Sequence, residues 1–405
     1  MGNTPNIRFK GFTNDWEQRK VSDVAKIIAG GTPSTKENSY WEPKEIPWLS
    51  SGEVHKKYIT FTDDMISQIG MNNSSAKMVA KDSVLIALAG QGKTRGTVAI
   101  NRIPLTTNQS IAAMTFNENF IPEFVFYNLE NRYDELRRMS SGDGSRGGLN
   151  KQLVGDIEIP YTEKKEQERI GSFFESLDRI ITLHQRKCDE TKKLKKFMLQ
   201  KMFPKKDAKK PEIRFAGFTD DWEQRKFGDI GSIAMCKRIF KEQTSDEGEV
   251  PFYKIGTFGV EPDAFISKEL FDEYKTKYPY PNKGDILISA SGSIGRTVEF
   301  TGKDEYFQDS NIVWLKHGNE IDNSFLKVLY SVVEWSCEGS TIKRLYNDNF
   351  LKTEFMLPQI DEQIKLGTYF SNLDHLITLH RRAYYNKKGG LTNVHNDNQQ
   401  HYAIL

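Results

Sequence analysis

The sequence carries the same fourteen-residue segment twice, and this duplication restricts the possible folds more than any other feature. Residues 7–20 read IRFKGFTNDWEQRK and residues 213–226 read IRFAGFTDDWEQRK, so twelve of the fourteen positions are identical at an offset of 206. The match returns further along, where residues 81–86 correspond to residues 283–288. Chance does not produce such a match, so the chain is a tandem duplication of one unit. The regions between these matches differ greatly, which predicts a shared scaffold with two separate specificities.

Each copy is predicted to close with a long helix. Residues 166–184 and 362–380 share the pattern EQ, G, F, LD and ITLH at an offset of 196. Their apolar residues recur at alternating steps of four and three, which is the seam spacing of a coiled coil. We therefore predict helices over about residues 162–203 and 361–388 that pair with each other. The alternative is that each helix packs only within its own domain.

The second helix is predicted to be the shorter one. Two glycines at positions 389 and 390 interrupt it, and the residues beyond them are polar with no seam spacing. Glycine is a weak helix former, so we expect this helix to end near Lys388. The predicted order is a globular domain, a helix with its linker, a second globular domain, a shortened helix and a polar tail: residues 1–161, 162–206, 207–358, 359–388 and 389–405.

Composition narrows the class of protein. The 405 residues carry a formal net charge of only +2, so any surface that binds nucleic acid has to be local. The three cysteines lie far apart without zinc-ligand spacing, which fits a reducing compartment. The N-terminus lacks the apolar core of a signal peptide, and no run approaches the roughly 20 apolar residues that span a bilayer. We expect a cytoplasmic protein that does not contact membranes.

Three segments resemble catalytic or nucleotide-binding motifs, and none fits well. Residues 87–94 read ALAGQGKT, but a phosphate-binding loop requires glycine at the first position. Residues 142–147 match GxGxxG but follow a helix-like stretch, whereas a dinucleotide site needs a strand before the motif. Asp263, Glu273 and Lys275 fit a loose PD…ExK nuclease pattern, in which two carboxylates hold a metal. We expect no catalytic residue and no metal site.

Loop residues with basic or amide side chains are the candidates for contacts with double-stranded DNA. Arginine can pair with guanine, and asparagine or glutamine with adenine, in the major groove. Lysine and arginine also bind phosphates, which supplies affinity. The competing interpretation is that many of these residues are solvated surface groups. The candidates are Lys93, Arg95, Asn108, Gln109 and Arg146 in the first copy, and Arg296, Gln308, Lys343 and Arg344 in the second.

In its repeated GFxxDWEQRK segments, its helix pattern and its two divergent regions, the chain resembles the specificity subunit of a type I restriction–modification enzyme. The resemblance covers nearly the whole chain. It implies a mixed α/β fold in which two globular target-recognition domains with twisted sheets are separated by two helices. Those helices would form an antiparallel coiled coil with a pseudo-twofold relation. Each variable region would read one half of a bipartite DNA site, and the helices would set the gap between the halves.

The resemblance also implies partners. Two modification subunits would dock on the helices and the repeated scaffold, and restriction subunits would join them. S-adenosylmethionine, ATP and magnesium would bind those partners, and this chain would be the non-catalytic recognition subunit of a restriction endonuclease and adenine methyltransferase complex. A shortened second helix predicts weaker assembly with modification subunits than in a full-length relative. The matching positions of the spacer and docking region are Gln167, Phe174, Leu177, Asp178, Ile181 and His184, with Gln363, Phe370, Leu373, Asp374, Ile377 and His380.

Two other functions remain open on the sequence alone. One is a stand-alone nuclease that uses Asp263, Glu273 and Lys275, which magnesium-dependent cleavage of plasmid DNA would reveal. The other is an adaptor that is built around the coiled coil and does not bind DNA. Salt-sensitive DNA binding would argue against the adaptor, because phosphate contacts weaken steeply with salt.

Overall fold

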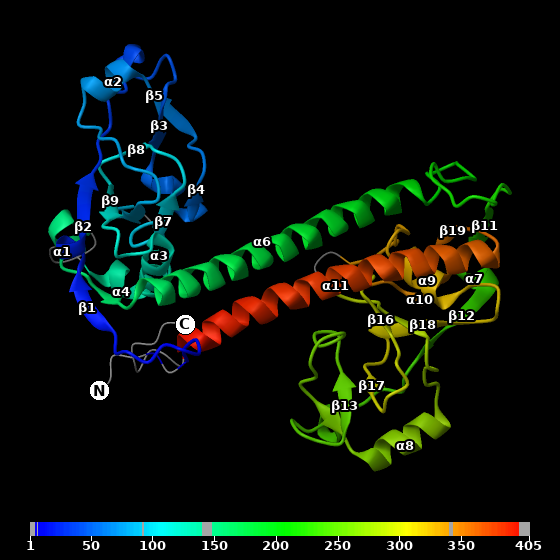
Figure 1. Cartoon of the computed structure of the whole chain (residues 1–405). Helices are drawn as coiled ribbons and strands as arrows, with labels where there is room; N and C mark the ends of the chain where they lie inside the picture. The colour runs from blue at the N-terminus through cyan, green and yellow to red at the C-terminus, as the bar shows by residue number, and fades with distance from the viewer. Residues whose placement is uncertain (1–4, 6, 91–92, 140–147, 340–342, 397–405) are drawn as a thin grey trace. The chain divides into compact units, whose positions relative to one another are not determined.

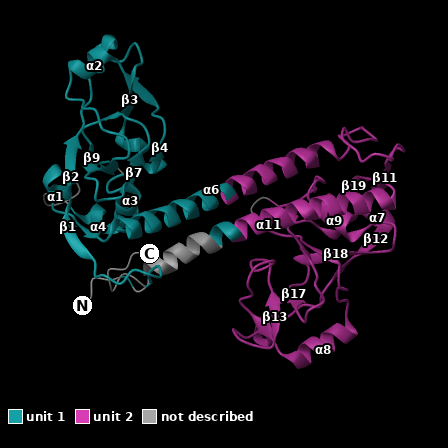
Figure 2. Ribbon diagram, viewed as in Figure 1, with its two compact units in different colours: residues 1–183, 383–405 teal, residues 184–382 magenta. Residues whose placement is uncertain are grey.

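The structure is a computed structural model that describes residues 5, 7–90, 93–139, 148–339 and 343–396, with only the helical backbone described for residues 386–396. It divides into two compact units, coloured separately in Figure 2: unit 1 is residues 1–183 with 383–405, and unit 2 is residues 184–382. Each unit combines helices with mixed sheets, which confirms the predicted α/β class. Within the described ranges, no helix is long and apolar enough to cross a membrane.

Unit 1 is built around a five-stranded sheet in the order β2-β9-β6-β7-β4. The central strand β6 is buried at every position, so it packs on both faces. Val84 and Ile86 join a core that contains helix α3, whereas Leu85 and Ala87 join a second core on the opposite face. Figure 1 labels the strands β1 (Glu17–Lys20), β2 (Ala25–Ala29), β3 (Ile46–Leu49), β4 (Tyr58–Ile59), β5 (Asp64–Ile66), β7 (Val98–Asn101), β8 (Thr106–Thr107) and β9 (Ile111–Phe116), and the helices α1 (Val21–Val24), α2 (Gln68–Asn72), α3 (Pro122–Asn131) and α4 (Tyr133–Arg138). The unit also contains the strands β6 (Val84–Ala87) and β10 (Glu158–Tyr161) and the helix α5 (Lys151–Gly155).

Unit 2 repeats this plan with the sheet β12-β18-β15-β16, which matches β2-β9-β6-β7 strand for strand. Its central strand β15 is again buried at every position. Ile286 and Ile288 face one core and Leu287 faces the other, so the alternation of unit 1 is preserved. The strands are β11 (Glu223–Lys226), β12 (Gly231–Met235), β13 (Val250–Tyr253), β14 (Phe265–Ile266), β15 (Ile286–Ser289), β16 (Thr297–Glu299), β17 (Tyr306–Phe307), β18 (Ile312–His317) and β19 (Glu354–Leu357), and the helices are α7 (Phe227–Ile230), α8 (Lys268–Lys277), α9 (Asn323–Leu329) and α10 (Asn347–Lys352).

The repeated EQRK segment forms the same small sheet in both units. In unit 1, β1 pairs antiparallel with β10, and Glu17 lies opposite Tyr161. In unit 2, β11 pairs antiparallel with β19, and Glu223 lies opposite Leu357. A long helix follows each pair after a short connection: α6 (Lys164–Lys201) after β10 and α11 (Ile360–Asn396) after β19. The duplication is therefore retained in strand order and in register.

The predicted end of the second helix is wrong. α11 continues through both glycines to Asn396, whereas the sequence predicted an end near Lys388. Each glycine costs only about 1 kcal/mol relative to alanine inside a helix, and no proline follows to block the helix. The expectation of weaker assembly rested on a helix that ends at Lys388, so its premise does not hold.

The predicted coiled-coil seam begins too early along both helices. Ile170 and Phe174 pack into the globular core of unit 1, and Leu366, Phe370 and Leu373 pack into the core of unit 2. For the first helical turns of α6 and α11, the alternative prediction is correct: each helix packs within its own domain. The same spacing of four and three suits a core-facing stripe and a helix pair, so periodicity alone did not separate them.

Further along, α6 and α11 contact each other within unit 2. Nδ1 of His184 lies 3.1 Å from Nδ1 of His380, and the Cys188 thiol lies 3.8 Å from the Ile377 carbonyl oxygen. Nζ of Lys195 then lies 2.6 Å from the carboxylate of Asp374. Residue numbers rise along α6 while they fall along α11, so the two helices are antiparallel here.

Candidate nucleic-acid interface

The candidate loops of unit 1 gather at one end of the five-stranded sheet. Ala29 ends β2 opposite Ala112 of β9, and Ala87 ends β6 opposite Ile111. β7 starts at the same end, because it pairs antiparallel with β6. The register thus brings together the described segments of three loops: residues 30–32 after β2, 88–90 and 93–97 between β6 and β7, and 108–110 before β9.

The same end of the unit 2 sheet gathers the equivalent loops. Met235 ends β12 opposite Val313, and Ser289 ends β15 opposite Ile312. A further segment joins them, because the Leu345 N–H donates to the backbone oxygen of residue 290 at 2.9 Å. The segments at this end are residues 236–238, 290–296, 308–311 and 343–345.

Two of the predicted amide residues have internal roles in these loops. Oδ1 of Asn108 accepts from the backbone N–H of Ser110 at 3.1 Å, and Oε1 of Gln308 accepts from the backbone N–H of Ile255 at 2.8 Å. Both side chains are half-buried. Reading adenine uses the amide oxygen together with the amide nitrogen. Asn108 and Gln308 therefore shape the loops, and this role competes with base contact.

The basic candidates lie on the same loops. Lys93, Lys343 and Arg344 are exposed, and Arg95 is half-buried. Arg296 is exposed and its Nη1 donates to the Phe258 carbonyl oxygen at 2.8 Å. Arg146 and the GxGxxG segment at residues 142–147 lie outside the described residues. A DNA contact by any of these side chains remains a prediction.

The structure adds a polar pair in each unit that sequence reasoning missed. In unit 1, the Thr32 hydroxyl donates to Oε1 of Gln109 at 2.6 Å. In unit 2, Nε of Arg238 donates to Oδ2 of Asp309 at 2.7 Å. In unit 1 the pair joins the segment after β2 to the segment before β9. In unit 2 it joins the segment after β12 to the segment before β18. Thr32 and Arg238 lie in the divergent regions, where the repeat offers no signal.

A buried ion pair anchors the start of α6 to the N-terminal repeat segment. The Arg8 guanidinium donates to both oxygens of Glu166, at 2.5 and 2.7 Å. Trp16 Nε1 and the Thr162 hydroxyl donate to the same carboxylate at 3.0 and 2.5 Å. Burial opposes ionisation of Glu166, but the hydrogen bonds, with that of Arg8 the strongest, hold the pKa of its carboxyl below the ordinary value.

The equivalent anchor in unit 2 has fewer hydrogen bonds. Arg214 donates to both oxygens of Glu362 at 2.7 Å, and this hydrogen bond raises the pKa of the guanidinium. Pro358 occupies the position of Thr162 and has no hydroxyl. Nε1 of Trp222 is buried without a hydrogen-bond partner among the described residues. The repeat contained a signal for these anchors, since the arginine, tryptophan and glutamate recur in both copies.

Gln167 and Gln363 attach the helices to their own globular domains. Oε1 of Gln167 accepts from the Ile121 N–H at 3.0 Å, just before α3, and Oε1 of Gln363 accepts from the Asp322 N–H at 2.9 Å, just before α9. Both glutamines are fully enclosed. In the spacer and docking region these two residues therefore hold a helix to its globular domain, as do the buried Phe174 and Phe370, and a contact with partner subunits stays a prediction.

The remaining spacer positions differ between the copies. Asp178 accepts from the Tyr127 hydroxyl at 3.1 Å inside unit 1, whereas Asp374 pairs with Lys195 across the two helices. Leu177 and Leu373 pack against the globular cores, and Ile181 is half-buried while Ile377 is buried. At these positions, identical residues of the two copies thus do not make equivalent contacts.

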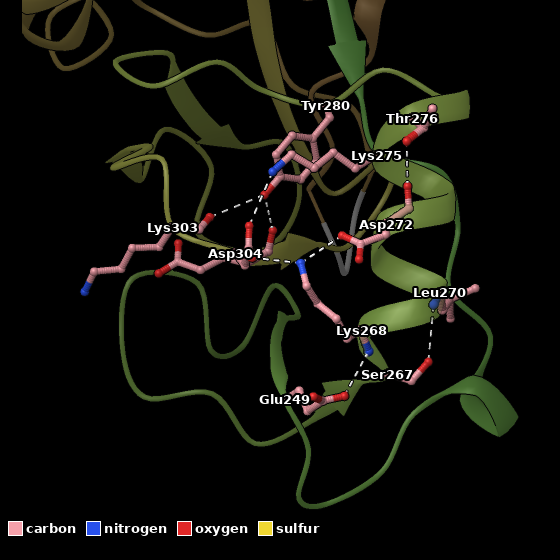
Figure 3. A network of polar contacts seen from close by, with 11 residues as sticks. Glu249, Ser267, Lys268, Leu270, Asp272, Lys275, Thr276, Tyr280, Lys303 and Asp304 are labelled. Atoms are coloured by element: carbon pink, nitrogen blue, oxygen red, sulfur yellow. Dashed lines mark hydrogen bonds and ion pairs between the residues drawn. The ribbon is translucent and has the colours of Figure 1, made fainter.

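The residues of the nuclease-like pattern are each held by a different neighbour. Asp263 forms an ion pair with a lysine at 2.9 Å, and Glu273 pairs with a lysine one turn along α8. Lys275 lies 3.3 Å from Asp304 and over the ring of Tyr280, in the network that Figure 3 shows. A nuclease site needs carboxylates that converge on a metal, so nothing here supports the nuclease hypothesis. In the part of the chain that the structure describes, no three or more His, Cys, Asp or Glu side chains form a metal-binding group.

Comparison with protein families gives two matches to one model. The model for the type I restriction modification DNA specificity domain matches residues 13–193 and again residues 219–386. The two matched ranges contain the two sheets and their loops, and together they cover most of the chain.

Individual relatives agree with this match. A putative type I restriction enzyme specificity subunit of Haemophilus influenzae is 54% identical over 151 residues, which are 37% of this chain and 39% of that protein. The type I restriction enzyme MjaIX specificity subunit of Methanocaldococcus jannaschii is 25% identical over 297 residues, 69% of this chain and 66% of that protein. The chain thus spans less than two thirds of either relative. The crystal structure of a type I restriction-modification S subunit from M. genitalium shares the fold, with a TM-score of 0.62, 15% identity and 97% coverage of both chains.

Proposed function

The chain belongs to the type I restriction modification DNA specificity domain family, and we propose that it recognises a bipartite DNA sequence and confers that specificity on a restriction–modification complex. The observation that carries this proposal is the double match of the family model. Each match contains one sheet whose end gathers basic and amide side chains on adjacent loops. Two loop-bearing units with different side chains are suited to read two different half-sites.

The loops supply the two kinds of contact that DNA recognition needs. Exposed lysines and arginines can neutralise phosphates, and this term does not depend on sequence. A side chain that a neighbour fixes through an atom not needed for the base, such as Arg238 through Nε, can read a base edge. The net charge of +2 means that attraction to DNA has to come from such local clusters.

The partners and cofactors are part of the proposal. Two modification subunits would bind the chain, and restriction subunits would join the complex. Adenine methylation and DNA cleavage would take place on those subunits, which would hold S-adenosylmethionine, ATP and magnesium. The chain itself would contribute recognition and no catalytic residue.

The decisive experiment is a methylation map. The chain is co-expressed with its modification subunit in a host that lacks adenine methylation, and modified bases are mapped across the genome. We expect one motif made of two short specified halves with a fixed unspecified gap. Methylation at one continuous short motif, or none above background, would contradict the proposal.

A binding measurement separates DNA recognition from a purely structural adaptor. The assembled complex is titrated with a duplex that carries the mapped motif, at salt concentrations from 50 to 200 mM. Counterion release predicts that affinity falls steeply and linearly on a log–log plot. No salt-sensitive binding to this duplex would favour the adaptor.

A further inference from the structure

The ion pair between Arg238 and Asp309 sits at the loop end of the unit 2 sheet. Arg238 follows β12 by three residues and Asp309 precedes β18 by three, and β12 and β18 are paired neighbours. The equivalent position in unit 1 holds the pair of Thr32 and Gln109. The two units therefore place different polar side chains at the same point of the same scaffold.

The pair is asymmetric in exposure. The Arg238 side chain is 61% exposed, whereas the Asp309 side chain is only 16% exposed. An isolated surface ion pair contributes little to stability, about 0–1 kcal/mol. Its geometry is better suited to holding the arginine in place, because the aspartate lies on the turn that leads into the sheet.

The contact leaves the reading end of the arginine available. Asp309 accepts from Nε of Arg238 at 2.7 Å, and no hydrogen bond from either Nη atom is found among the described residues. The two Nη groups are the paired donors that match O6 and N7 of guanine in the major groove. A guanidinium fixed through Nε also loses less conformational entropy when it binds.

Basic side chains also lie on the loops at this end of the sheet and could hold the phosphate backbone. Lys237 precedes Arg238 in the chain and is exposed. The backbone of Arg344 forms an antiparallel β-bridge with Ser291 on the adjoining loop, and Lys343 beside it is exposed. Phosphate contacts set the register in which a central side chain meets a base.

We propose that Arg238 reads a guanine in the half-site bound by unit 2, with Asp309 as the residue that positions it. This inference rests on the proposed function and makes it specific to one residue and one base. Gln109, held through its oxygen by Thr32, occupies the corresponding position in unit 1 and would act on the other half-site.

The test compares methylation maps of variants in the co-expressed complex. Arg238→Ala is expected to remove the preference for guanine at one position of one half-site, with discrimination there reduced roughly 10- to 100-fold. Arg238→Lys keeps the charge but not the paired donors, so it should retain DNA affinity and lose most of this discrimination. Gln109→Ala should leave that half-site unchanged and alter only the other one.

The positioning role of Asp309 has its own readout. Asp309→Asn keeps the size of the side chain and weakens its hold on the guanidinium. It should reduce the discrimination in favour of guanine at the same base position as Arg238→Ala, to a smaller extent. Hydrogen exchange of β18 should stay as in the wild type. A change in exchange without a change in the map would mean that Asp309 is only structural.

The matched control is Lys277→Ala. Lys277 forms an exposed pair with Glu273 on α8, outside the repeated scaffold, with Nζ 2.9 Å from the carboxylate, so the same charge is removed from another site in unit 2. Its map should equal that of the wild type. A bipartite wild-type motif that Arg238→Ala leaves unchanged would overturn this inference alone. A wild-type complex without a bipartite motif would overturn the proposed function and this inference with it.

Discussion

In unit 1 the carboxylate of Glu166 accepts hydrogen bonds from Arg8, Trp16 and Thr162, whereas in unit 2 that of Glu362 is bound by Arg214 alone among the described residues. The bidentate ion pair is common to both anchors. The additional hydrogen bonds to the carboxylate occur only in unit 1, among the described residues, although both anchors descend from one duplicated unit.

The difference teaches that the ion pair defines the anchor, and that packing can replace the surrounding hydrogen bonds. Trp222 lacks a partner for Nε1 but packs against Phe203 at 5.8 Å and Phe325 at 6.2 Å between ring centroids. Trp16 makes one such ring contact, with Phe124 at 5.6 Å. An unpaired buried N–H costs about 1–3 kcal/mol, which aromatic packing of this kind can offset.

Removing the carboxylates should produce the largest effect. Glu166→Ala leaves Arg8 and Trp16 Nε1 without their acceptor, so we expect a loss of about 4 kcal/mol in unit 1. Glu362→Ala should cost unit 2 less, about 3 kcal/mol, because Arg214 still donates to the Asp220 carbonyl oxygen at 2.7 Å. Hydrogen exchange of peptides from residues 164–183 and 360–382 reports each unit separately. An equal or larger loss in unit 2 would contradict the comparison.

Replacing the hydroxyl of unit 1 tests whether the extra hydrogen bonds matter. Thr162→Val keeps the shape of the side chain and removes one donor to a charged acceptor, so unit 1 should lose about 2 kcal/mol. Thr182→Val, on the exposed face of the same helix, is the control and should change stability by less than about 0.5 kcal/mol. If both variants behave alike in hydrogen exchange, the hydroxyl does not contribute to the anchor.

The two tryptophans offer a smaller and sharper contrast. Trp16→Phe and Trp222→Phe remove similar ring volume from buried positions. Only Trp16 also loses a hydrogen bond, so its variant should be destabilised by about 1.5 kcal/mol more than that of Trp222. Paired hydrogen-exchange measurements on the two variants check the difference. A Trp222→Phe variant that costs as much as Trp16→Phe would imply that the Trp222 N–H is bonded in solution.

The anchors also illustrate how much the sequence predicted. The repeat identified the two units and the position of α6, because identical residues at a fixed offset indicate the same backbone structure. The pairing of the repeated EQRK segments with β10 and β19 was not predicted. The repeat could not show that Pro358 in place of Thr162 removes a donor from the anchor, since the carboxylate that accepts this bond is bound by Arg8 and Trp16, 158 and 150 residues away. Periodicity likewise did not reveal that Phe174 and Phe370 face globular cores.

The candidate interface was predictable only in outline. Antiparallel register brings the loops to one end of each sheet, and a sequence without known strand pairing does not define that end. Gln109 was identified by its side-chain type, whereas Arg238 was not, because nothing in the repeat marks its position. The contact with Asp309 that singles out Arg238 joins segments 71 residues apart.

The smallest effect we expect is a pH dependence of unit 1. The folded pKa of Glu166 lies below the ordinary value of 4.5, because the hydrogen bonds to its carboxylate outweigh the effect of burial. The stability that the carboxylate contributes is therefore fully present above about pH 4.5, and it is lost as pH falls through the folded pKa. Glu166→Gln cannot titrate, so the difference in thermal stability between wild type and this variant should shrink between pH 6 and pH 3. The exposed Glu168→Gln variant makes the same charge change outside the anchor. If the difference in thermal stability from the wild type shrinks equally for Glu168→Gln and Glu166→Gln, the anchor is not the cause of the pH dependence.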